Sequence, residues 1–120
     1  MSHIARIQSR VQDLTAVAAA CRRLELPEPT HGTARLYSGE VTGLMVQLPG
    51  WRFPVVIDTA SGTIEFDNYG GEWGEHQHLD RFLQIYAVEK SRLEARQKGF
   101  PVSEQLLQDG SIRLQIIEGA

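Results

Sequence analysis

The last third of the chain places a long helical pattern directly before a hairpin pattern. Apolar residues recur at helical spacing through residues 79–98, and Gly99 and Pro101 then end the helix. The turn residues 108–111 (Gln-Asp-Gly-Ser) lead into the β-branched segment 112–117, as in a short hairpin. A long helix and a closing hairpin in one small chain indicate the α+β class.

The first third of the chain predicts a strand followed by a shorter helix. Residues 2–10 carry two isoleucines between polar residues, which favours a strand, and Asp13 stands where a helix N-cap belongs. Five apolar residues then follow on one helical stripe: Leu14, Val17, Ala18, Cys21 and Leu24. Pro27 and Pro29 are expected to close this helix.

The middle of the chain has the pattern of four short strands. They are expected over residues 33–37, 43–48, 53–59 and 63–69. In the last of these, Ile64 and Phe66 alternate with Glu65 and Asp67, which indicates a sheet with one apolar and one polar face. The sequence therefore predicts a single, mostly antiparallel, twisted sheet with two helices packed on one face. The expected order is β-α-β-β-β-β-α-β-β, and the other face is expected to be free.

Length and composition indicate a single cytoplasmic domain over residues 1–120, with 42% apolar and 22% charged residues. No apolar run approaches the roughly 20 residues of a membrane-spanning helix, and the N-terminus lacks the apolar core of a signal peptide. The single cysteine, Cys21, cannot form an internal disulfide, which favours a reducing compartment. Its place in the helical stripe predicts a buried thiol.

The distribution of charge argues against nucleic acid as a partner. The formal net charge is −3, and residues 27–78 carry two arginines against seven acidic residues. The two helical segments are only mildly basic, whereas a nucleic-acid binder would show a denser basic stripe.

Several segments together resemble one protein family. They are residues 1–4 with Ile7, residues 79–87, Ala95, residues 99–100, Val102, Glu104 and residues 109–114. These segments are similar to the family first noticed as the hypothetical chloroplast reading frame thirty-five, a domain of unknown function. Relatives lie near genes for AAA-type ATPases and ferredoxin-like proteins, so the resemblance implies an accessory role beside such a protein.

The connector 70–78 allows a metal site as one interpretation. His76, His78 and the nearby Glu72 supply nitrogen and oxygen ligands of the kind that zinc takes. The alternative is a polar connector in which His78 lies near the N-cap of the following helix. The sequence favours this alternative, because the connector has no cysteine and no second group of ligands.

Four aromatic residues of the middle region form a candidate partner-binding set: Trp51, Phe53, Tyr69 and Trp73. Tryptophan and tyrosine dominate the hot spots of protein interfaces. The same four side chains would also serve to cap the open end of a hydrophobic core, and the sequence leaves both interpretations open.

No catalytic constellation is recognisable in the sequence. The glycine-rich residues 70–74 lack the lysine and the spacing of a phosphate loop, and no serine lies in a nucleophile elbow. Asp58 would pair with Glu65 or Asp67 across a hairpin, but solvated acids on the outer face of the sheet are the favoured interpretation.

We therefore expect a small non-enzymatic accessory module that binds a protein partner and needs no cofactor. The alternative is a metal- or small-ligand-binding accessory of a redox or AAA-ATPase-linked system. The adjacent apolar residues Ile116 and Ile117 in the last strand also predict a homodimer formed through a strand edge.

Overall fold

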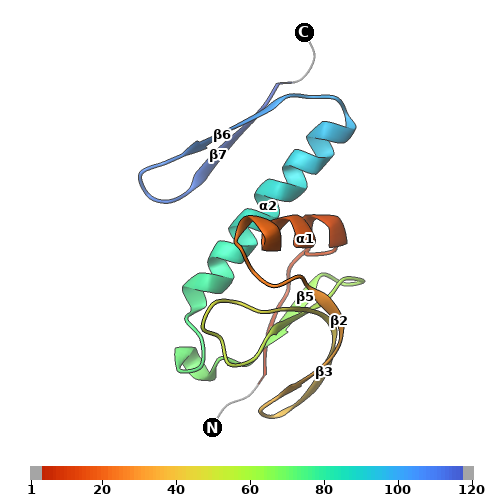
Figure 1. The fold of residues 1–120 in the computed structure, drawn as a ribbon, viewed down its shortest axis with the longest axis vertical. Helices are drawn as coiled ribbons and strands as arrows, with labels where there is room; N and C mark the ends of the chain where they lie inside the picture. The colour runs from red at the N-terminus through yellow and green to blue at the C-terminus, as the bar shows by residue number, and fades with distance from the viewer. Residues whose placement is uncertain (1–3, 118–120) are drawn as a thin grey trace.

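The computed structural model describes residues 4–117 and contains within them two α-helices, a five-stranded sheet and a separate hairpin (Figure 1). The elements are β1 (Ala5–Ile7), α1 (Leu14–Arg23), β2 (Thr30–Leu36), β3 (Gly39–Val46), β4 (Val55–Asp58), β5 (Thr63–Phe66), the 3-10 helix η1 (Tyr69–Gly71), α2 (His76–Gln97), β6 (Val102–Leu106) and β7 (Ile112–Ile116). This order confirms the α+β class and adds η1 to the predicted elements. Residues 2–3 of the predicted first strand lie outside the described residues.

The five-stranded sheet is antiparallel and has the order β1-β5-β4-β3-β2. One face carries a continuous set of buried side chains: Leu44, Val46, Val55, Ile57, Ile64 and Phe66. They form the main core together with buried residues of both helices, among them Val17 of α1 and the fully buried Phe82 of α2. Both helices therefore pack on the same face of this sheet.

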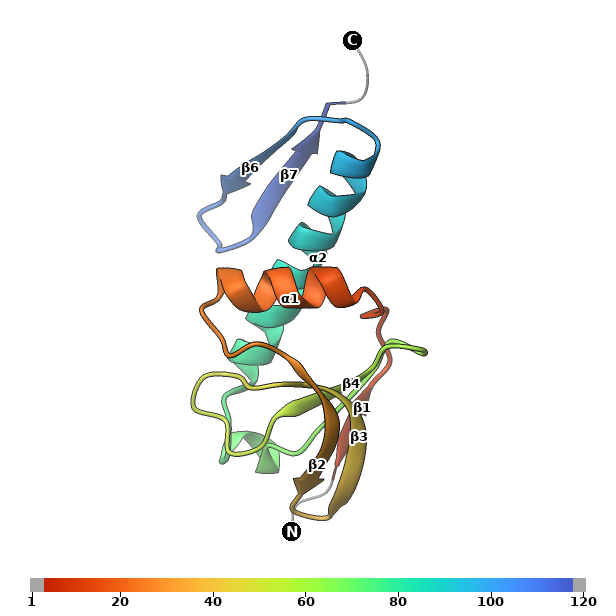
Figure 2. The same ribbon diagram turned by 45° about the vertical axis from the view of Figure 1, so that its right-hand side comes forward.

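The prediction of a single sheet is wrong, because β6 pairs only with β7. The 22 residues of α2 extend about 33 Å at 1.5 Å per residue, and β6 begins just after the far end of this helix. The helix thus carries the chain away from the edges of the main sheet. The hairpin lies against the distal half of α2 instead (Figures 1 and 2).

The second face of the main sheet is covered in part, which corrects the expectation that it is free. A second cluster buries Ala34, Leu36 and Val56, with Ile4, Val41, Met45 and Phe53 packed against it. Two strands separate β1 from β3, yet a Cβ on Gly39 would lie only 3.8 Å from the Cδ1 atom of Ile4. The sheet therefore curls so that β2 and β3 bend over this face (Figure 2). Gly43 permits the bend, because a Cβ there would lie 2.5 Å from the carbonyl oxygen of Ile57.

Both helices end in a residue with a left-handed backbone. This residue is Gly99 after α2 (φ 74°) and Glu25 after α1 (φ 58°). In each case the amide of the following residue donates to the carbonyl oxygen five residues before it. Phe100 donates to Ala95 at 2.9 Å, and Leu26 donates to Cys21 at 2.8 Å. The first helix thus ends before the prolines that were expected to close it. Neither α1 nor α2 is long and apolar enough to cross a membrane.

The buried face of α1 differs from the predicted stripe. Its buried residues are Ala16, Val17, Ala20 and Cys21. Small side chains dominate this face, whereas Leu14 is 56% exposed. Cys21 is fully buried as predicted, and burial raises the pKa of its thiol to about 11, so the thiol stays protonated at neutral pH.

Candidate functional site

Four aromatic side chains and one arginine gather near the end of the main sheet that lies away from the hairpin β6–β7. We call this group the Trp73 cluster: Tyr37, Arg52, Phe53, Tyr69 and Trp73. The centroid of the Trp73 ring lies 4.8 Å from that of Tyr69, 5.2 Å from that of Tyr37 and 5.7 Å from that of Phe53. Figure 1 shows the short η1 turn at the lower end of the molecule and the hairpin at the upper end.

Arg52 adds a positive charge to these rings. Its guanidinium carbon lies 4.6 Å from the centroid of the Trp73 ring and 5.4 Å from that of Phe53, which is cation–π geometry. Its backbone amide also donates to the Trp73 carbonyl oxygen at 2.8 Å. Within residues 4–117 no carboxylate forms a salt bridge with Arg52. The charge is therefore held in place by the rings and stays open to an outside anion.

The Trp73 cluster has a buried side and an exposed side. Phe53 packs against the second core cluster, under the curled sheet. Tyr37 is 64% exposed and Tyr69 is 38% exposed, while Trp73 between them is half-buried. The aromatic residues thus cap a core from one side and present rings to solvent on the other.

Asn68 organises the loop that carries Trp73. Its carbonyl oxygen accepts from the amides of Gly71 at 3.0 Å and Trp73 at 2.9 Å, and its Nδ2 donates to the carbonyl oxygen of Gly74 at 3.1 Å. The Asn68 side chain is buried, and Tyr69 beside it adopts a left-handed backbone with φ of 49°. These hydrogen bonds hold the backbone of the loop that carries Trp73 in place.

Trp51 was predicted with this set but lies in the main core. It is 5% exposed, its ring centroid is 5.7 Å from that of Phe66, and its Nε1 donates to the carbonyl oxygen of Glu75 at 3.0 Å. A Cβ on Gly74 would lie 2.5 Å from the Trp51 ring, so a glycine is needed there. The predicted surface set is thereby reduced to Phe53, Tyr69 and Trp73.

Three residues of the site were not among those predicted from the sequence. Tyr37 lies in the two-residue turn between β2 and β3, and an aromatic residue in a tight turn is a signal of exposure. Arg52 stands between two aromatic residues in the sequence, which is a signal for stacking. Asn68 lies two residues before the pair Gly70-Gly71, where its backbone and side chain both serve a turn.

The three predicted metal ligands do not form one group. His76 and His78 lie in the first turn of α2, where side chains two residues apart point about 200° apart around the axis. The Nε2 atom of His76 lies 3.3 Å from the Oδ1 atom of Asp80, whereas His78 and Glu72 line a surface pocket of about 350 Å³. No group of three histidine, cysteine or acidic side chains in residues 4–117 is placed to hold a metal ion.

The three acids considered for a carboxylate pair have separate surroundings. Asp58 accepts from the amide of Ala60 at 3.0 Å, and Glu65 forms a salt bridge of 3.0 Å with Arg6. Asp67 is only 2% exposed, and neither of its carboxylate oxygens accepts a hydrogen bond from the part of the chain that is described. Asp67 is therefore a buried residue rather than the solvated one that was expected.

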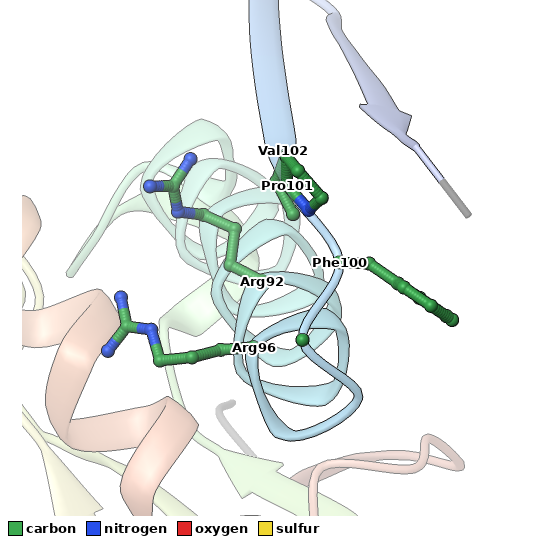
Figure 3. A pocket seen from close by; sticks show the side chains of 6 residues that line it. Arg92, Arg96, Phe100, Pro101 and Val102 are labelled. Atoms are coloured by element: carbon green, nitrogen blue, oxygen red, sulfur yellow. The ribbon is translucent and has the colours of Figure 1, made fainter. Parts of the chain in front are cut away.

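A second pocket, of about 350 Å³, lies at the C-terminal end of α2 (Figure 3). Arg92 and Arg96 extend to one side of it, and Phe100 points the other way. Arg92 donates to Glu104 at 2.6 Å, so its charge is already matched. The carbonyl groups at a helix C-terminus also disfavour an anion. We therefore interpret this pocket as part of the attachment of the hairpin.

Comparison with known proteins adds no assignment to these surfaces. No protein-family model, curated protein or solved structure matches the chain. The Trp73 cluster is therefore interpreted from its own geometry.

Proposed function

We propose that this chain is a non-enzymatic module that binds a protein partner through the Trp73 cluster. The observation that carries the proposal is the central Trp73, whose backbone amide is bonded to Asn68 and whose ring is flanked by the exposed rings of Tyr37 and Tyr69. An exposed aromatic group that the fold holds in place needs little ordering when a partner binds.

The composition of the Trp73 cluster suits a protein ligand. Tryptophan, tyrosine and arginine are enriched in the hot spots of protein interfaces. Arg52 is stacked on Trp73 and forms no ion pair with a carboxylate among the described residues. It would therefore bind a carboxylate group of the partner protein. We infer a partner segment that places an apolar side chain on the rings and an acidic residue beside Arg52.

The clear pKa shifts in the molecule have structural causes. Among the described residues, the clear shifts belong to Cys21, Arg23, Lys90, Glu104 and Asp109. Burial explains the shift of Cys21, and hydrogen bonds within ion pairs or a turn explain the others. None of these five residues belongs to the Trp73 cluster.

AAA-type ATPases and ferredoxin-like proteins are the first partners to test, on the basis of the resemblance described above. The metal-binding alternative has weaker support, because His76 and His78 point in different directions on α2.

Site-specific photo-crosslinking in living cells tests the proposal. A photoreactive phenylalanine replaces Tyr37 in one version of the full chain and Leu14, which is 56% exposed on α1, in the other. We expect a discrete protein adduct from position 37 only, and we expect Arg52→Glu to remove it. Identical adducts from both positions, or none from position 37, would contradict the proposal.

A further inference from the structure

The hairpin β6–β7 is a two-stranded sheet without a core of its own. None of its ten strand residues is buried, and Leu106 is 71% exposed. Isolated two-stranded hairpins are marginal in water, and three or more strands are usually needed for a stable sheet. Only Ile112 of these residues packs against the main core. The hairpin is thus an incomplete sheet.

The outer edge of β7 presents backbone groups that have no strand beside them. Two hydrogen bonds between β6 and β7 show which opposed residue pairs are bonded to each other. The amide of Leu107 donates to the Ser111 carbonyl oxygen at 2.9 Å, and the amide of Ile117 donates to the Pro101 carbonyl oxygen at 3.0 Å. Opposed pairs alternate between bonded and non-bonded in an antiparallel ladder. The N–H and C=O groups that point away from β6 therefore belong to Ile112, Leu114 and Ile116. In residues 4–117 no other strand pairs with this edge.

We propose that β7 pairs with β7 of a second copy of this chain, in an antiparallel register centred on Leu114. This register places Leu114 opposite Leu114 of the second copy, and Ile112 opposite Ile116. Arg113 then lies opposite Gln115, so no like charges face each other. The two hairpins form one four-stranded sheet around a two-fold axis, with the apolar side chains on one face.

The edge of β6 is less suited to the same pairing. Its outward backbone groups belong to Val102, Glu104 and Leu106, by the same alternation. A symmetric register centred on Glu104 would place two carboxylates opposite each other. A register centred on Gln105 would place each Glu104 opposite Leu106. The sequence of β7 is therefore self-complementary where that of β6 is not.

Two proline variants separate the edges, with molar mass measured by light scattering over a range of protein concentrations. Ile116→Pro removes an outward N–H from β7, and Leu106→Pro removes one from β6, while both leave the hairpin bonds intact. We expect wild type and Leu106→Pro to be dimers and Ile116→Pro to be a monomer. A monomeric wild type, or loss of the dimer in Leu106→Pro alone, would overturn the proposal.

Disulfide trapping gives a readout that does not depend on the folding of the proline variants. In the proposed register, residues 113 and 115 of the two copies are directly opposed. We expect the double variant Arg113→Cys/Gln115→Cys to form a covalent dimer on mild oxidation. The matched variant Ser103→Cys/Gln105→Cys on β6 should stay monomeric in non-reducing gels. Trapping through β6 but not β7 would refute the pairing.

Discussion

The carboxylate of Glu104 in β6 accepts a hydrogen bond of 2.6 Å from the guanidinium group of Arg23 at the end of α1. Arg92 of α2 donates to its other oxygen, also at 2.6 Å. One side chain therefore links the hairpin to both helices, in a part of the molecule where apolar packing is sparse. Glu89 lies 3.8 Å from Arg23 and 3.7 Å from Arg92 and completes the network.

Replacing Glu104 with glutamine should loosen the hairpin. We expect Glu104→Gln to lower the free energy of unfolding by about 1 kcal/mol and to speed amide exchange in β6 and β7 more than in β4. The control is Glu94→Gln, which removes only an exposed i,i+4 pair with Lys90. Equal effects of the two substitutions on hairpin exchange would contradict the linking role of Glu104.

The contribution of Glu104 to stability should depend on pH. The hydrogen bond from Arg23 holds the pKa of Glu104 below its usual value of 4.5. A carboxyl group whose pKa is lowered by folding stabilises the native state above its unfolded pKa, and this contribution is lost as the pH falls through the folded pKa. The difference in unfolding free energy between wild type and Glu104→Gln should thus be full at neutral pH, shrink as the pH falls below about 4.5, and vanish once the pH is below the lowered folded-state pKa. A difference that persists unchanged in acid would disprove this assignment.

At the C-terminal end of each helix, glycine should give a more stable protein than the alternative residue. Glu25→Gly should raise the free energy of unfolding by up to about 1 kcal/mol, because glycine adopts the left-handed backbone without steric cost. Gly99→Ala at the matching position of α2 should lower it by about 1 kcal/mol. Thermal unfolding of both variants checks the signs, and a destabilised Glu25→Gly would count against the backbone argument.

The hydroxyl group of Tyr86 joins α2 to the start of α1. It accepts hydrogen bonds of 3.2 Å from the amides of Gln12 and Asp13. Tyr86→Phe should cost about 1–2 kcal/mol, because it leaves both donors without this partner. Tyr37→Phe, at an exposed hydroxyl, is the control and should be nearly neutral in urea unfolding.

Truncation of apolar residues should separate the core from the surface. Phe82→Ala should cost about 3–5 kcal/mol, because Phe82 is fully buried in the main core. Leu14→Ala should cost less than about 1 kcal/mol, although Leu14 belongs to the predicted helical stripe. Similar losses in urea unfolding would show that the exposure of Leu14 is misassigned.

Local patterns predicted both α-helices and the seven strands of this fold, but not the 3-10 helix η1. Asp13 caps α1 as expected, with its Oδ1 accepting from the Ala16 amide at 3.1 Å. Gly99 ends α2, and the turn at residues 108–111 joins β6 to β7. The start of α2 was predicted three residues late, since the polar residues 76–78 carry no apolar periodicity. These signals act over a few residues, so they are visible in the sequence.

The arrangement of the elements was predicted less well. Trp51 and Phe53 are aromatic residues two positions apart, yet one lies in the main core and the other under the curled sheet. Tyr37 and Trp73 are far apart in the chain and meet only because the β2–β3 turn reaches the loop after β5. No local sequence pattern indicates a contact between residues so far apart in the chain.

The sequence by itself determined the order of helices and strands, the N-cap of α1, the C-terminal stop of α2 and the burial of Cys21, because backbone propensity and capping depend on neighbouring residues. The tertiary structure alone decided that β6 and β7 form a sheet of their own, that the main sheet curls, and that the Trp73 cluster assembles. These outcomes depend on contacts between distant segments, for which the length of α2 and the bend at Gly43 set the geometry.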